Sequence, residues 1–266
     1  MEKPRLITRD CLRAAGASAI LLVAACSASP SAPPEQTSPP GYRPPDEVHN
    51  ATVVWSAEPH INLFASDPTI VRAAAEALEV GQLAGPDKSY PGFDEAVTDP
   101  TTRGIYFRKA NRDTVYGTLY KHILDITPTD TGFIAYTCES FKDFAVERDG
   151  KYNTSRSRRG HSQTISFVRT KWDSSGLPLT ITSAPTTTLP TTPSPAPGPP
   201  EWQAPEDNLF TGWIIDPGVP GDYDSQRCVP WVATLDPDAP AEPETITTDT
   251  PPETLPAYPG WPRYRH

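Results

Sequence analysis

The strongest helical pattern in the chain lies in SDPTIVRAAAEALEVGQLAG, residues 66–85. Apolar and small residues recur there at helical spacing, which favours burial of one side of a helix against a core. Asp67 is a favourable N-cap, Pro68 suits the first turn, and Gly85 followed by a proline suits the end. The residues expected on the buried side are Ile70, Ala74, Ala77, Leu78 and Gly81. The segment therefore predicts one amphipathic helix.

Further along the chain, apolar residues alternate with a period of two. The stretch VYGTLYKHILDI, residues 115–126, predicts a long strand, and the turn signal TPTDTG leads from it into FIAYTCESFKDFAV. TISFVRTKW and NLFTGWIID predict two further strands. The residues expected to share one face of the first strand are Tyr116, Thr118, Tyr120, His122, Leu124 and Ile126. Helices followed by antiparallel strands predict an α+β domain, with an N-terminal helix packed on a curved, cone-like antiparallel sheet.

The first 25 residues have the layout of an export signal. Four basic residues precede an apolar run, residues 14–25, which is shorter than the roughly 20 residues that a membrane-spanning helix needs. The basic residues are Lys3, Arg5, Arg9 and Arg13. The following VAAC, Val23 to Cys26, resembles the lipobox of bacterial lipoproteins. That resemblance implies cleavage before Cys26, acylation of its thiol, and a protein anchored on the outer face of the cell membrane. The alternative is an ordinary secretory signal in which Cys26 is incidental.

The composition bounds the folded part of the chain. The sequence contains 34 prolines in 266 residues, well above the usual share of about 5%. They gather in three stretches that we expect to be disordered: a tether at 26–47, a Thr/Pro-rich insert at 182–205 and a tail at 236–266. One α+β domain, residues 48–235 interrupted by the insert, remains. The formal net charge of −10 argues against nucleic acid as a partner.

The order of these elements resembles a known family. A helix, the turn YPGF, and strands carrying AYTCES and ISFVRTKW are similar to the nuclear-transport-factor-two-like fold of exported lipoproteins from actinobacteria such as mycobacteria. Cys138, Glu139 and Trp172 match the expected cysteine, its acidic neighbour and the aromatic strand end. The resemblance covers about residues 50–180. It implies a cone-shaped domain with an interior able to hold a ligand.

The cysteine count predicts one disulfide. Cys11 is removed with the signal and Cys26 is expected to carry lipid, which leaves Cys138 and Cys228 in an oxidising compartment. We expect these two to be bonded, with two unpaired thiols as the alternative. Such a bond would join the segment RCVPWVATL to the predicted sheet.

Residues that carry chemistry are few. None of the five histidines has the spacing of a zinc ligand set, and no nucleotide-binding or nucleophile motif is present, so we expect no metal and no cofactor. His122, on the predicted apolar strand face, is a candidate general base, although a core histidine is the simpler interpretation. Asp113 and Asp125 lie on the opposite strand face. The basic segment at 148–159 is expected to be a solvated hairpin tip, with recognition of an acidic partner as the alternative.

Three functions remain open from the sequence. The favoured one is a non-catalytic envelope lipoprotein that binds a small apolar ligand or docks an envelope protein. The others are a structural surface protein without a ligand and an acid–base enzyme using His122 with a carboxylate. For the favoured function, we expect a pocket between one helix face and one strand face. Its expected lining residues are Ile70, Ala74, Leu78, Tyr116, Tyr120 and His122.

Overall fold

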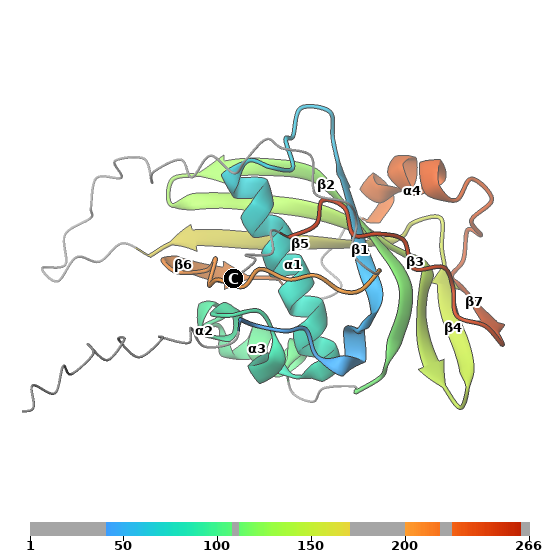
Figure 1. Cartoon of the computed structure of the whole chain (residues 1–266). Helices are drawn as coiled ribbons and strands as arrows, with labels where there is room; N and C mark the ends of the chain where they lie inside the picture. The colour runs from blue at the N-terminus through green and yellow to red at the C-terminus, as the bar shows by residue number, and fades with distance from the viewer. Residues whose placement is uncertain (1–40, 108–111, 171–199, 219–224, 262–266) are drawn as a thin grey trace, which may run out of the picture. The chain divides into compact units, whose positions relative to one another are not determined.

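The computed structural model describes residues 41–107, 112–170, 200–218 and 225–261 (Figure 1). These form an α+β unit with a mostly antiparallel sheet. In chain order its strands are β1 (Asn50–Ala57), β2 (Val115–Thr129), β3 (Gly132–Arg148), β4 (Lys151–Arg156), β5 (His161–Arg169), β6 (Trp213–Asp216) and β7 (Glu244–Thr248). Its α-helices are α1 (Ser66–Ala84), α2 (Phe93–Ala96), α3 (Pro100–Tyr106) and α4 (Val229–Leu235), and its 3-10 turns are Asp46–Val48, Pro86–Lys88 and Ser225–Cys228.

The long strand β3 organises the sheet. It pairs with β2 along most of its length, with β5 through residues 132–139 and with β4 through residues 146–148. β6 extends the sheet beyond β5, and β7 extends it beyond β4. The predicted strands at β2, β3, β5 and β6 are confirmed. The prediction of a wholly antiparallel sheet is wrong, because β1 precedes α1 and pairs with β2 in parallel.

Helix α1 has nearly the predicted bounds, and its end is the predicted one. Gly85 is its C-cap, with a φ of 116° that disfavours any side chain, and its N–H donates to the Gly81 carbonyl. The predicted N-cap is wrong. The helix begins one residue before Asp67, with Ala65 at the N-cap and no side chain capping it. Burial of the apolar and small residues along α1, and not a cap, is what stabilises this end.

The two faces of the sheet are covered by different helices (Figure 1). One apolar cluster contains most of α1 together with inward residues of β1, β2, β3 and β5, among them Trp55, Leu119 and Phe167. A second, smaller cluster joins Tyr136 and Cys138 to Trp231 and Val232 of α4 and its preceding turn. Because side chains alternate along a strand, odd-numbered residues of β2 from 115 to 123 belong to the α1 face.

Two irregularities in the pairing of β2 with β3 explain one departure from the predicted strand face. The register shifts between Thr118 and Tyr120 and again between Ile123 and Asp125. Tyr120, before the second shift, and Leu124, within it, pack against the α4 cluster. Ile126, beyond the second shift, packs against the α1 cluster. A bulge adds one residue and so exchanges the faces beyond it. The predicted single face from Tyr116 to Ile126 is therefore wrong at its end.

The prediction of a disordered tail is wrong for residues 236–261. β7 pairs with β4, and Tyr258 exchanges backbone hydrogen bonds with Val53 and Trp55 at the open edge of β1. Trp261 is only 8% exposed and belongs to the core. Prolines here remove few donors that the sheet needs, because the segment lies at edges where the strands supply the partners.

A buried carboxylate fixes this tail to α1. Glu76 accepts hydrogen bonds of 2.7 Å from the indole N–H groups of Trp55 and Trp261 and from the Tyr90 hydroxyl. Burial raises the pKa of Glu76, and Arg72 opposes that shift. Trp202 donates to the Tyr90 hydroxyl, so the end of the predicted insert packs into the same network. Three donors on one carboxylate satisfy a group that would otherwise destabilise the core.

The predicted tether is also shorter than expected. Tyr42 packs edge-on against Tyr90 and donates to the Lys88 carbonyl, so residues 41–47 belong to the folded unit. The export signal, Cys26 and residues 26–40 lie outside the described residues, as do residues 182–199 and Trp172. No helix among the described residues is long and apolar enough to cross a membrane.

Candidate functional site

The structure separates the two faces that were expected to line one pocket. Ile70, Ala74 and Leu78 are buried in the α1 cluster, which also contains Leu119 and Ile123 of β2. Tyr116, Tyr120 and His122 lie on the other face of β2. The Tyr116 ring packs edge-on against Tyr152, and the Tyr120 hydroxyl donates to Asp143 at 3.0 Å. The predicted apolar cavity between these residues is therefore wrong, because both faces of β2 carry apolar side chains and the sequence does not say which one meets α1.

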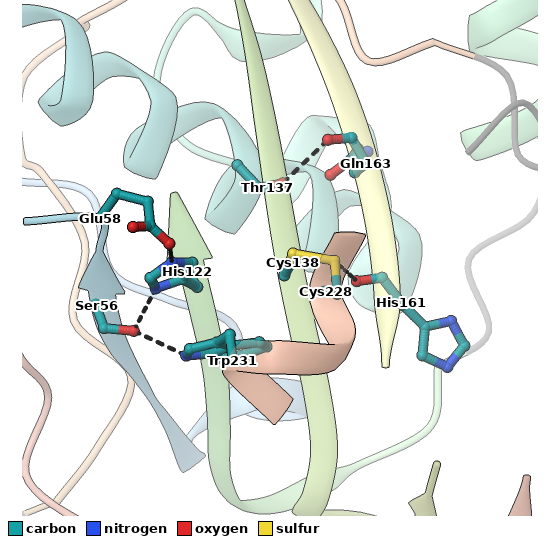
Figure 2. Close-up of a disulfide and its surroundings, with 9 residues drawn as sticks. All are labelled: Ser56, Glu58, His122, Thr137, Cys138, His161, Gln163, Cys228 and Trp231. Carbon is teal, nitrogen blue, oxygen red and sulfur yellow. Dashed lines mark hydrogen bonds and ion pairs between the residues drawn. A yellow bond between two sulfur atoms is a disulfide. The ribbon is translucent and has the colours of Figure 1, made fainter. Parts of the chain in front are cut away.

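His122 lies beneath α4 in a chain of hydrogen bonds (Figure 2). The indole N–H of Trp231 donates to Ser56 Oγ at 3.0 Å, and Ser56 Oγ lies 2.8 Å from His122 Nδ1. His122 Nε2 lies 3.3 Å from Glu58 Oε1. Because Glu58 accepts only, neutral His122 carries its proton on Nε2, and Ser56 donates to Nδ1. The indole N–H of Trp231, Ser56 Oγ and both ring nitrogens of His122 thus all have partners.

The imidazole of His122 is also covered. Its ring stacks on Trp231 with centroids 5.3 Å apart, and the residue is 5% exposed. Burial lowers the pKa of His122, and the hydrogen bond and charge of Glu58 oppose that shift. Neither aspartate considered from the sequence is a partner: Asp113 pairs with Arg148 and Asp125 lies near Arg227. Glu58, which the sequence analysis missed, follows β1 and is brought to His122 by the parallel pairing of β1 with β2.

A disulfide holds α4 against this face. Cys138 of β3 is bonded to Cys228 at the start of α4, as predicted, with Cα atoms 5.6 Å apart (Figure 2). Both cysteines are fully buried beside Trp231 and Val232. The bond therefore fixes a seven-residue helix, too short to be stable alone, over His122.

A cavity opens on the opposite face of the sheet. It has a volume of about 400 Å³ and lies between α1 and the strands β2, β3 and β5. The side chains that give it its chemistry are Glu79, Gln82, Lys121, Glu139, Phe141 and Gln163. Charged, polar and aromatic groups line this space beside the apolar Ala75 and Leu78. Of the six residues predicted for the pocket, Leu78 lines this cavity and the three strand residues do not.

Lys121 is the least expected member of this cavity. It is 2% exposed, and its Nζ donates to Glu139 Oε2 at 2.7 Å. Burial opposes its charge, but Glu139, Glu79 and Glu76 outweigh burial and raise the pKa of Lys121. It is therefore an ammonium group buried by the fold and held in an ion pair. A lysine between Leu119 and Ile123, on the strand face that packs on α1, was the available sequence signal.

Glu79 differs from Glu139 because none of the ion pairs among the described residues includes it. Burial raises its pKa from 4.5 to about 7; the charge of Lys121 opposes this shift and that of Glu139 adds to it. Near neutral pH the carboxyl of Glu79 is thus divided between its acid and its ionised form. A group of this kind in a cavity is a candidate for binding or proton exchange.

Part of the basic segment is a solvated hairpin tip, as predicted: Arg148 and Lys151 flank the turn between β3 and β4 with exposed side chains. Residues 151–156 form β4, which pairs with β7, and Arg156 makes a two-pronged ion pair with Asp236 at 2.8 and 2.7 Å. Arg158 and Arg159 are exposed. The described residues contain no group of histidine, cysteine or acidic side chains arranged to hold a metal ion.

Comparison of the chain with protein-family models, with curated proteins and with solved structures gives no match.

Proposed function

We propose that this chain is an exported lipoprotein, anchored to the outer face of the cell membrane through Cys26, whose folded unit binds a small molecule without changing it. One observation carries the binding role: a cavity of about 400 Å³ contains Lys121 and Glu79, two ionisable groups that an apolar core would exclude. Cavities with a few convergent polar groups and shifted pKa values are typical of binding sites. Because these groups are polar, the ligand is expected to be polar, not apolar as the sequence suggested.

The cone-like architecture is part of the same proposal. Helix α1 lies against a sheet whose central strands β2 and β3 are irregularly paired, which supports a curved sheet. Strand β1, before the helix and parallel to β2, departs from the helix-first order that the resemblance to the nuclear-transport-factor-two-like fold implies. The competing hypothesis is a structural protein without a ligand, and the cavity argues against that hypothesis.

The experiment for binding is native mass spectrometry of the full chain purified from its native host. We expect a small molecule on the wild type that is lost in Gln82→Phe, since Gln82 lies in the cavity wall and is only half-buried. Thr101→Phe, at an exposed position of α3, is the matched control and should keep the ligand. Equal spectra from all three proteins, with nothing bound, would favour a structural role.

The anchor is tested separately. Metabolic labelling with a fatty acid should mark the wild type and not Cys26→Ala, and only the wild type should partition into a detergent phase. A wild type without label would mean that Cys26 carries no acyl group and would overturn the proposed anchor.

A second candidate function, acid–base catalysis at His122, is favoured by the chain of Ser56, His122 and Glu58. Two observations argue against it. The indole N–H of Trp231 already donates a hydrogen bond to Ser56 Oγ, and His122 does not line the cavity. A fluorophosphonate probe distinguishes the two functions. We expect no labelling of Ser56; labelling that disappears in His122→Asn would support the enzyme.

A further inference from the structure

The cavity beside α1 has an excess of negative charge, and this bears on its ligand. Lys121 supplies one positive charge and is already paired with Glu139 at 2.7 Å. Glu79, on the neighbouring wall, has no ion pair among the described residues and is left to be neutralised by a proton or by a ligand. The other ionisable groups that face this site are Glu76 of α1, His161 of β5 and Tyr106 of α3. Glu76 is occupied by its three donors.

The rest of the wall supplies partners for a positively charged group. Gln163 is 6% exposed, and its carboxamide takes part in none of the hydrogen bonds found among the described residues. Such a group is satisfied when a ligand or water reaches it. Phe141 and Tyr106 add aromatic rings to the same wall, and an aromatic face attracts a cation. The acceptor oxygens and rings of this cavity therefore match an ammonium group better than a carboxylate.

We propose that the cavity binds a small organic amine in its cationic form, with Glu79 as the carboxylate that receives the ammonium group and Gln163 as a hydrogen-bonding partner. This inference rests on the proposed binding function. It names the class of ligand for that same cavity.

An anionic ligand would meet a less favourable site. Its charge would lie near Glu79 and Glu139, and the one nearby cation would have to leave an existing ion pair of 2.7 Å. Breaking a buried pair costs more than an exposed one, because the freed carboxylate is not solvated. The formal net charge of −10 on the chain also attracts cations and repels anions at long range.

The site couples binding to a proton. A cationic amine binds the ionised form of Glu79, so binding displaces the proton that this carboxyl holds at lower pH. The affinity for the amine is therefore expected to rise as pH increases through about 7, the pKa of Glu79. A neutral ligand would show no such rise.

Three probes of equal length test the class of ligand: n-butylamine, n-butanol and butyrate. Each is titrated into the isotopically labelled full chain, and binding is followed by NMR shifts of cavity residues at pH 6 and pH 8. We expect shifts only with butylamine, with tighter binding at pH 8. Glu79→Gln should weaken butylamine binding about tenfold and remove the pH effect. Glu95→Gln, the same change at an exposed carboxylate of α2, should alter neither.

The outcomes separate this inference from the binding function. Preference for butanol or butyrate, absence of binding by all three probes, or an unchanged affinity in Glu79→Gln overturns the amine assignment. If one of these results is found while the wild type from its native host still carries a molecule that Gln82→Phe lacks, the cavity binds a ligand of another class and the proposed function stands.

Discussion

The two faces of one sheet are closed in different ways. On the α4 face, a short helix is held by a disulfide, and Trp231, Ser56, His122 and Glu58 satisfy one another in sequence. On the α1 face, a helix of 19 residues covers a large core, yet a cavity remains in which Glu79 has no ion pair among the described residues.

This contrast indicates a structural role for His122 and a binding role for the cavity that contains Glu79. His122 has the residue types of an acid–base centre around it, but its neighbours use their hydrogen-bonding groups on one another. Glu79 has fewer chemically suggestive neighbours, but it lines an open cavity together with Gln163, whose carboxamide takes part in none of the hydrogen bonds found among the described residues. The presence of reactive residue types therefore says less about function than whether their polar groups are already paired.

The largest effect is expected from removing the disulfide that closes the α4 face. Replacing Cys138 and Cys228 together by alanine should lower the free energy of unfolding by about 4 kcal/mol, because the bond closes a loop with a sequence separation of 90 residues. Urea unfolding of both proteins, each carrying Cys26→Ala, measures this change. A stability within about 0.5 kcal/mol of the parent would show that α4 is held by packing alone.

A somewhat smaller effect is expected on the α1 face from the tail. Trp261→Ala should cost about 3 kcal/mol, because it empties a buried site and removes one donor to Glu76. Tyr258→Ala is the matched control, since the Tyr258 side chain is 54% exposed and its backbone makes the contacts with β1. Equal, small losses in both variants would mean that the tail does not pack as described.

Elements of this fold that depend on neighbouring residues could be predicted from the sequence, and those that depend on residues distant in sequence could not. The C-terminal end of α1 and the strands β2, β3 and β5 follow from Gly85 and from local periodicity, so they were predictable. The order of the tail was not, because its prolines indicate disorder locally while Trp261 is stabilised by Glu76, far away in sequence. Local composition carries no information about such partners.

The candidate site was hidden for a related reason. β2 has apolar residues on both faces, and only tertiary packing decides that Leu119 and Ile123, and with them Lys121, meet α1. The sequence therefore placed the pocket on the face of Tyr120 and His122. The disulfide was predictable, because the expected loss of Cys11 with an export signal and the expected acylation of Cys26 left only one pair of cysteines.

A moderate effect is expected from the hydrogen bond that closes the α4 face. Trp231→Phe keeps an aromatic ring on His122 but removes the N–H that donates to Ser56. We expect a loss of about 1 kcal/mol in chemical unfolding. A loss several times larger would indicate that the indole has a further packing role.

The pH dependence of stability also distinguishes the two faces, because Glu79 and His122 act on it in opposite directions. The native state holds the Glu79 proton up to about pH 7 and the unfolded chain releases it near 4.5, so this group lowers stability as pH rises between these values. His122 has a lowered pKa, so it lowers stability as pH falls below its usual 6.5. Urea unfolding from pH 4.5 to 8 should show the first slope vanish in Glu79→Gln and the second in His122→Asn. Unchanged slopes in the variants would contradict these assignments.

The most direct test of the account compares the two faces in one titration. Butylamine is added at pH 8 to the labelled full chain while two side-chain signals are followed, the Gln163 carboxamide of the cavity and the indole N–H of Trp231 under α4. The account predicts that the Gln163 signal shifts in a saturable way and that the Trp231 signal stays in place. Saturable shifts at Trp231 with none at Gln163 would contradict it, because the binding site would then lie on the α4 face.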